Sequence, residues 1–289
     1  MTKPSLRAAL NSGQFVAAPG LHDMIAAVIG NKVGLDFAYA SGYWLTASAH
    51  GIPDAGIATY TQMLERVSTL CRVSTASIIA DADTGYGGLL NVHHTVRGYE
   101  DAGVMAIQIE DQEFPKKCGH TPGKRVVPLE DMVDKIKVAL EARRSLETLI
   151  IARTDARQGE GFEGAMKRGL AFAEAGADVV FLEALESEDE MREACRRIRA
   201  PMMANMADGG KTPVRPASEL KAMGYAVAIY PATTALSAAH AMQNSLAAFK
   251  THGTSQTSAQ ELFDFNEFNK LIGFPEIWEF DRRWARDRV

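Results

Sequence analysis

The sequence predicts an α/β fold in which eight parallel strands close into a barrel with helices around it. Two observations predict this fold. Short apolar runs alternate with amphipathic helical patterns throughout residues 15–250 of the 289-residue chain. Polar residues directly follow several of these runs, as expected where the strands of a parallel barrel end. The alternative is an open doubly wound sheet, but the chain lacks a glycine-rich dinucleotide fingerprint that would favour it.

Four strands are expected directly after glycine residues that end helices. These units span residues 34–41, 103–110, 176–183 and 224–231, and each begins with Gly. Glycine suits the left-handed conformation just past a helix C-terminus. The residues that follow are mostly β-branched, aromatic or otherwise apolar, which indicates strands buried on both faces. The last residue of each unit is therefore expected at the carboxyl end of a strand.

The spacing of apolar residues typical of strands and of amphipathic helices predicts the other four strands and most of the helices. The remaining strands are expected at residues 15–18, 77–80, 149–152 and 201–204. Amphipathic helical patterns cover residues 92–102, 129–143, 162–175, 188–199 and 217–223, and a further helix is expected at 233–250.

Residues 251–289 are predicted to form a helical extension of a barrel domain that spans residues 1–250. Helical patterns cover 258–272 and 275–288. The aromatic residues of this segment are Phe263, Phe265, Phe268, Phe274, Trp278, Phe280 and Trp284. A solvated appendage would not expose so much apolar surface, so we expect this segment to pack on another subunit.

Composition narrows the function classes. Lys and Arg number 31 and Asp and Glu 36, giving a net charge of −5, which argues against a nucleic-acid partner. No apolar run is long enough for a membrane span, and the N-terminus lacks a secretory pattern. Three cysteines, Cys71, Cys118 and Cys195, do not make a disulfide framework, so the reducing cytoplasm is expected. Cys71 and Cys195 are interpreted as structural.

Acidic residues at two neighbouring strand ends predict a metal site. Asp81 and Asp83 lie on the same side of an extended segment, and Glu110 ends the next strand. Carboxylates that converge at one barrel end repel strongly unless a divalent cation lies among them. The all-oxygen set suits Mg²⁺ or Mn²⁺ better than Zn²⁺. The alternative is that the aspartates only cap the next helix.

The loop after Glu110 is polar and long for a connection from strand to helix. Such loops at a catalytic face often act as lids. It carries Cys118 between Lys116, Lys117 and His120, cations that should lower the pKa of the thiol and suit it to acid/base or nucleophilic work. The alternative is a surface cysteine among solvated lysines.

Arg153 ends the fifth strand and is a candidate clamp for an anionic substrate. An arginine beside a carboxylate-lined metal site can hold a carboxylate through two parallel hydrogen bonds. The alternative is a structural salt bridge to Asp155 or Glu183.

Five blocks of sequence carry the most specific information. They are 81–87 (Asp-Ala-Asp-Thr-Gly-Tyr-Gly), 110–112 (Glu-Asp-Gln), 116–120 (Lys-Lys-Cys-Gly-His), 151–156 (Ile-Ala-Arg-Thr-Asp-Ala) and 204–213 (Ala-Asn-Met-Ala-Asp-Gly-Gly-Lys-Thr-Pro). In this order they resemble the isocitrate lyase/phosphoenolpyruvate mutase superfamily. The loop at 116–120 is similar to that of its carbon–carbon lyases, whereas the phosphonate enzymes have a cysteine-free loop. Residues 41–43, 114–120 and 123–128 especially resemble the 2-alkylmalate lyase and oxaloacetate hydrolase branch.

The resemblance implies roles for particular residues. Asp81 and Asp83 match metal carboxylates, and Glu110 and Asp54 match residues that hold metal-bound water. The positions that match substrate-binding groups are Ser41, Gly42, Tyr43, Lys116, Lys117, Gly119, Arg153, Glu183, Asn205 and Thr233. The family fold also implies a homotetramer in which C-terminal helices swap between neighbouring subunits.

The resemblance also implies the groups that move protons. Cys118 matches an acid/base on a mobile loop, with His120 supporting it. Tyr43 is a candidate base for the substrate hydroxyl, with a packing role as the alternative. Trp44 occupies a position where many family members have a small residue. A bulky indole there is expected to narrow the pocket unless Trp44 faces away from it.

The expected function is a Mg²⁺- or Mn²⁺-dependent lyase that cleaves the C2–C3 bond of a 2-hydroxy dicarboxylate, of the 2-alkylmalate or 2-methylisocitrate type. The products would be an α-oxo acid and a second carboxylic acid. Hydrolysis of oxaloacetate to oxalate and acetate is the main competing hypothesis. A serine at the position of Thr233 is associated with that hydrolysis in the family, so the threonine favours the lyase. Two further hypotheses are phosphonopyruvate chemistry and a non-catalytic protein that binds oxo acids.

Overall fold

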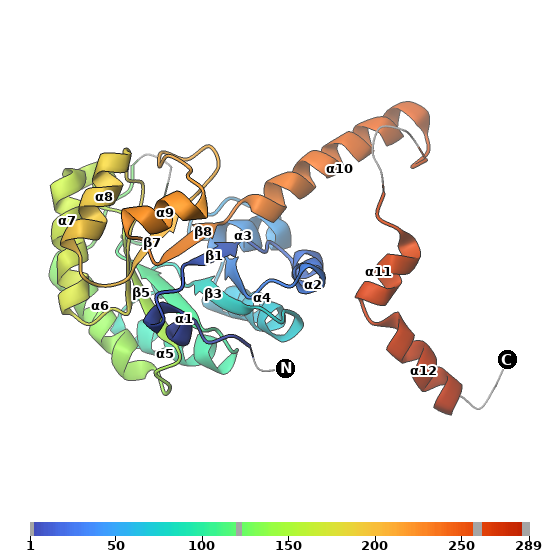
Figure 1. Cartoon of the computed structure of the whole chain (residues 1–289), viewed down its shortest axis with the longest axis horizontal. Coiled ribbons are helices and arrows are strands. Elements are labelled where there is room, and N and C mark those ends of the chain that lie inside the picture. The colour runs from blue at the N-terminus through green and yellow to red at the C-terminus, as the bar shows by residue number, and fades with distance from the viewer. Residues whose placement is uncertain (1–2, 120–122, 257–261, 285–289) are drawn as a thin grey trace.

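The predicted barrel is present. A computed structural model of the chain describes residues 3–119, 123–256 and 262–284. Eight parallel strands pair in the order β1-β8-β7-β6-β5-β4-β3-β2, and a parallel bridge between Gly20 and Tyr39 links the two ends of this order (Figure 1). The strands are β1 (Val16–Pro19), β2 (Phe37–Ala40), β3 (Ser77–Asp81), β4 (Ala106–Glu110), β5 (Leu149–Thr154), β6 (Val179–Leu182), β7 (Met202–Asn205) and β8 (Val227–Tyr230).

All eight predicted strands are confirmed, with small shifts at their ends. The four glycines that were expected to end helices have positive φ angles, 74° at Gly34, 87° at Gly103, 95° at Gly176 and 107° at Gly224. A side chain is strained in this left-handed conformation, which is why glycine marks each entry into a strand.

Helices cover the outside of the barrel. They are α1 (Leu6–Asn11), α2 (Met24–Val33), α3 (Gly42–His50), α4 (Tyr60–Val73), α5 (Leu89–Asp101), α6 (Leu129–Ala142), α7 (Arg157–Glu174), α8 (Glu188–Arg197) and α9 (Ala217–Met223). Helix α7 begins earlier than its pattern predicts, because a kink at Gly161 (φ 72°) joins a preceding turn to it. Cys71 lies within α4, and burial raises the pKa of its thiol to about 11, which fits a structural role.

The alternation of side chains along each strand determines which polar residues face the mouth of the barrel. Side chains alternate along a strand, so in β5 Leu149 and Ile151 fill the interior, while Ile150 and Ala152 pack against the helices. The next inward position is Arg153. The same two-residue step from an interior apolar residue leads to Ser41, Asp81, Glu183 and Asn205, at the ends of their own strands.

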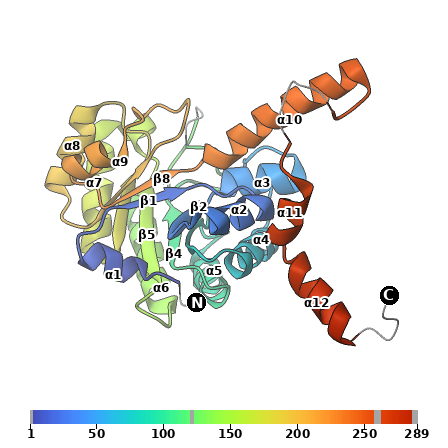
Figure 2. The ribbon, with the colours of Figure 1, turned by 45° about the vertical axis from the view of Figure 1, so that its right-hand side comes forward.

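The C-terminal helices lie at one side of the barrel, and the second of them contacts α2 (Figures 1 and 2). They are α10 (Thr233–His252), α11 (Phe265–Leu271) and α12 (Phe274–Trp284). Neither α11 nor α12 has a buried residue, and Phe265 and Trp284 are 75% and 63% exposed. Parts of the two helices expected at 258–272 and 275–288 lie outside the described residues. None of the described helices combines the length and apolar character that crossing a bilayer requires.

Candidate active site

A cavity of about 270 Å³ opens at the carboxyl ends of the strands. Most of the residues predicted from the sequence line it. These are Ser41, Tyr43, Asp54, Asp81, Glu110, Lys116, Lys117, Cys118, Gly119, Arg153, Glu183 and Asn205. Strands and loops that are far apart in the sequence therefore bring their polar ends to one place, as parallel barrels do.

Two predicted residues lie beside the cavity wall rather than in it, and one lies outside the described residues. The backbone N–H of Gly42 donates to Oδ2 of Asp81 over 3.3 Å. The backbone N–H of Asp83 donates to Oδ1 of the same carboxylate. His120 is not among the described residues, so its supporting role stays a prediction.

Thr233 lies apart from the other predicted residues. The residue is exposed at the start of α10, and its hydroxyl donates to the Tyr230 carbonyl over 2.9 Å. Because this bond holds the side chain at the end of β8, it does not line the cavity, whereas its neighbours Pro231 and Ala232 do. Its assignment to the substrate site therefore stays a prediction.

Asp81 is held by groups from three elements. Its Oδ1 atom accepts from the backbone N–H of Asp83 over 3.0 Å and from the side-chain amide of Gln108 over 3.2 Å. Asp83 itself has a φ of 48°, an uncommon conformation for a residue with a side chain. Such strain persists where the surroundings define the conformation, and it is common at functional sites.

Lys116 reaches into this acidic group. Its Nζ atom lies 2.5 Å from Oδ1 of Asp54 and 2.6 Å from Oδ1 of Asp83, and its side chain is only 3% exposed. Burial alone would lower the pKa of the ammonium. The surrounding carboxylates, Asp83, Glu110, Asp54 and Asp81, instead raise this pKa well above its usual value. Lys116 is therefore charged and paired.

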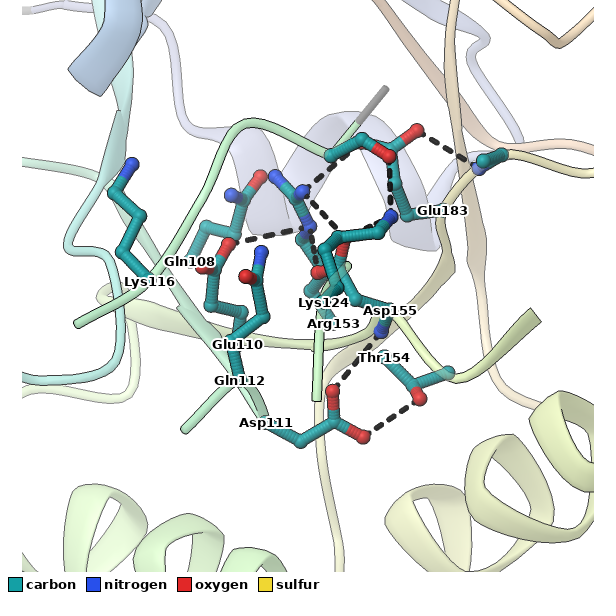
Figure 3. Close-up of polar contacts among 12 residues, drawn as sticks. Gln108, Glu110, Asp111, Gln112, Lys116, Lys124, Arg153, Thr154, Asp155 and Glu183 are labelled. Carbon is teal, nitrogen blue, oxygen red and sulfur yellow. Dashed lines mark hydrogen bonds and ion pairs between the residues drawn. The ribbon is translucent and has the colours of Figure 1, made fainter. Parts of the chain in front are cut away.

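Arg153 lies among three carboxylates (Figure 3). Its Nε and Nη2 atoms hold Asp155 at 2.8 and 3.0 Å, and Oε2 atoms of Glu110 and Glu183 each lie 3.3 Å away. The salt bridges considered as an alternative from the sequence are thus present. They orient the guanidinium at the cavity wall, where it can also meet a substrate anion.

Lys124 and Asp111 support Arg153 through Asp155, a connection that the sequence analysis missed. Lys124 Nζ lies 3.0 Å from Oδ1 of Asp155 and also donates to the Gly119 carbonyl. Asp111 accepts the Asp155 N–H over 2.9 Å (Figure 3). Burial alone would raise the pKa of Asp155, but Arg153 and Lys124 lower it to about 2. Asp155 is therefore ionised. The block at 151–156 was the sequence signal that could have revealed it.

Glu183, Asn205 and two aromatic rings also line the cavity. The Asn205 amide donates to Oε2 of Glu183 over 3.0 Å. Tyr43 and Trp44 pack edge to face with ring centroids 4.7 Å apart, and both line the cavity. Trp44 thus faces the pocket and restricts it. The loop after β7 adds Asp208, which sequence reasoning did not single out although it lies in the block at 204–213.

The acidic residues fit a hydrated divalent cation. Glu110 is 1% exposed, and its Oε1 atom accepts no hydrogen bond from any described residue. The carboxylate oxygens of the acidic residues are the kind of metal ligand that hard cations prefer. Within the described part of the chain, no three His, Cys, Asp or Glu side chains converge closely enough to enclose an ion directly. Ligation partly through water suits this arrangement, and Mg²⁺ commonly keeps several waters.

From the sequence, the converging carboxylates were expected to depend on a divalent cation alone for compensation of their charge. The structure corrects this expectation. Lys116, Lys124 and Arg153 already pair with five of the acidic groups, namely Asp54, Asp83, Glu110, Asp155 and Glu183. The chain therefore supplies its own compensating charge.

A barrel with this polar mouth defines an α/β enzyme class that acts on small anions, and comparison identifies the family. The family model described as phosphoenolpyruvate phosphomutase matches residues 6–250, and the chain belongs to that family. It is 42% identical to 2,3-dimethylmalate lyase of Eubacterium barkeri over 99% of both chains. It is 41% identical to 2-methylisocitrate lyase of Aeropyrum pernix over 97% of this chain and 90% of that one. A structure of oxaloacetate acetylhydrolase with 3,3-difluorooxalacetate superposes with a TM-score of 0.92 at 30% identity, covering 99% and 97% of the chains.

Replacing Lys124 with Met should destabilise the protein much more than removing an exposed lysine. The Lys124–Asp155 side chains are 2% and 0% exposed, so loss of the ammonium leaves buried acceptors, at a cost of about 2 kcal/mol or more. Lys137→Met is the control, because the Lys137–Asp134 pair is 62% and 56% exposed and contributes under about 1 kcal/mol. Urea unfolding measures both free energies. Equal losses would contradict a structural role for the buried pair.

Proposed function

We propose that this protein is a lyase that cleaves the C2–C3 bond of a 2-hydroxy dicarboxylate of the 2-alkylmalate or 2-methylisocitrate type. One observation carries the proposal, the convergence of Asp54, Asp81, Glu110, Arg153 and Cys118 on one cavity at the barrel mouth. Similarity over nearly the whole length to 2,3-dimethylmalate lyase and 2-methylisocitrate lyase supports the reaction class. The products would be an α-oxo acid and a second carboxylic acid.

The cation in this proposal is Mg²⁺ or Mn²⁺. Asp81 and Asp83 would hold it, with Asp54 and Glu110 binding its water ligands. When bound, such a cation stabilises negative charge on the hydroxyl and carboxylate oxygens of a substrate. The buried Oε1 atom of Glu110, which accepts no hydrogen bond from the described residues, supports this placement.

The chain's own residues would bind and orient the substrate. Ser41 and Gly42 would form the cradle for the α-oxo acid end, since the Gly42 backbone lies against Asp81. Arg153, with Glu183 and Asn205 beside it, would position a carboxylate. Lys116, Lys117 and Gly119 would stabilise the charge of the departing half.

Proton transfer would complete the cleavage. Tyr43 would take the proton of the C2 hydroxyl, and the electron pair of the broken C2–C3 bond would pass to the departing half. The Cys118 thiol would then protonate C3, with His120 in support. Tyr43 and Cys118 both line the cavity, which allows these roles.

Hydrolysis of oxaloacetate is the second candidate, because the oxaloacetate acetylhydrolase structure superposes so closely. The same cavity would bind oxaloacetate. Water would add to the C2 carbonyl, and cleavage of the C2–C3 bond with protonation of C3 would give oxalate and acetate. Release of oxalate from oxaloacetate distinguishes this activity from lyase activity.

A substrate panel with Mg²⁺, read by mass spectrometry, tests the lyase proposal. Wild-type protein should release an α-oxo acid from at least one substituted malate or 2-methylisocitrate, and EDTA should abolish the release. Cys118→Ser should lower kcat about 10²–10⁴-fold, because a hydroxyl is a far weaker acid than a thiol. Cys195→Ser is the control, since Cys195 lies on α8 and does not line the cavity. No oxo acid from any of these substrates would refute the proposal.

We further propose that the protein is a homotetramer in which residues 251–289 pack on a neighbouring subunit, and that it resides in the cytoplasm. The exposed apolar surface of α11 and α12 supports the first point, because such surface is usually covered. The second point is supported by Cys71, Cys118 and Cys195, since none of the three is joined in a disulfide.

Placing a charge on α12 should weaken the tetramer. Phe280 is 61% exposed in the single chain, and Phe280→Asp should shift the mass measured by light scattering toward smaller species. Leu146→Asp is the matched control, because Leu146 is 69% exposed on the barrel and should leave the mass unchanged. A monomeric wild-type protein would contradict helix exchange.

A further inference from the structure

The ammonium of Lys116 occupies a position between acidic groups that the proposed function assigns to a metal ion. Asp54 and Asp83, whose Oδ1 atoms lie 2.5 and 2.6 Å from Nζ, belong to different loops. The side chain is only 3% exposed. Lys116 is thus a buried ion bound to groups expected to bind the cation or its water ligands.

We propose that Lys116 is a tethered counter-ion of the metal site, which pairs with Asp54 and Asp83 before metal binds and turns into the substrate cavity when a divalent cation replaces it. This inference rests on the proposed metal site and concerns how that site is filled and coupled to substrate binding.

Charge balance supports the exchange. Buried carboxylates are costly without a partner, so the metal-free site needs a cation of its own. An ammonium and a dication that shared the same carboxylate oxygens would repel strongly at such short range. Of the acidic group, Asp81 is already bound by backbone and amide donors, while Asp54 and Asp83 face Lys116. Metal binding would therefore displace Lys116 from Asp54 and Asp83.

Packing indicates that the side chain moves and the backbone stays. Gly56 follows Asp54 closely in its loop, has a φ of 70°, and lies so near that an added Cβ would be 3.2 Å from the Lys116 backbone nitrogen. The two loops are thus held together. Lys116 also lines the cavity together with Lys117 and Cys118, so a rotation of its flexible stem is enough to turn the ammonium toward a substrate carboxylate.

The exchange couples metal and substrate. If the cation displaces Lys116 from the acidic residues, Lys116 must weaken metal binding by the same factor, since coupling between two sites is reciprocal. The displaced ammonium then faces the cavity and strengthens binding of an anionic substrate. We infer an order in which the metal binds before the dicarboxylate.

Titration of the wild-type protein and of Lys116→Met with MgCl₂ and MnCl₂, by calorimetry and without substrate, tests the exchange. Lys116→Met should bind either cation about tenfold more tightly or better, because it removes the ammonium that competes for the carboxylates of Asp54 and Asp83. The melting temperature of the metal-free variant should fall below that of metal-free wild type. Saturating Mg²⁺ should then raise the melting temperature of the variant more than that of wild type.

Lys117→Met is the matched control. It removes the same charge one residue further along the loop, where Nζ donates to the Gly123 carbonyl over 3.0 Å. Its Mg²⁺ affinity and metal-free melting temperature should stay close to those of wild type. Lys116→Arg keeps a cation beside the carboxylates and should bind Mg²⁺ no more tightly than wild type.

The outcomes separate this proposal from the proposed function. Unchanged Mg²⁺ affinity in Lys116→Met, or equal tightening in Lys117→Met, would overturn the counter-ion role while leaving the metal site intact. Failure of the wild type and every variant to bind Mg²⁺ or Mn²⁺ would overturn both. If metal-free Lys116→Met does not fold, Lys116→Arg decides, and tighter Mg²⁺ binding than in wild type would refute the exchange.

Discussion

Compensation of buried negative charge at the barrel mouth is the constraint on which the site depends. Strand alternation directs Asp81, Glu110 and Glu183 toward the same small volume, together with Arg153. Water is largely excluded there, so each carboxylate needs a cation or hydrogen-bond donors. Side-chain cations supplied by the chain meet most of this need. The arrangement is stable for this reason, and it is also prepared for an anionic ligand and a divalent cation.

The two principal cations of the cavity have different surroundings, and this difference indicates a division of roles. Arg153 is fixed by a two-point contact to Asp155, which Lys124 and Asp111 hold in turn. A planar guanidinium fixed in this way suits orientation of a substrate carboxylate. Lys116 is a point charge on a flexible stem, and its partners are the groups that a metal would use. A rigid cation and a movable one thus both line the cavity.

The relatives fit this view of the site. The matching family model covers the barrel and ends at residue 250, near the C-terminal end of α10. Relatives named as a lyase and as a hydrolase share the fold at 30% identity or more.

The sequence by itself determined the barrel, because strand periodicity and helix-ending glycines are local properties of the backbone. It also determined the polar residues at strand ends, since parallel strands carry their last residues to one edge. Only the tertiary structure decided the partners. The position of Lys116 between Asp54 and Asp83 and the support of Asp155 by Lys124 both depend on distances between loops far apart in the chain. No periodicity records such distances, because loop conformation is set by packing and charge rather than by neighbouring residues.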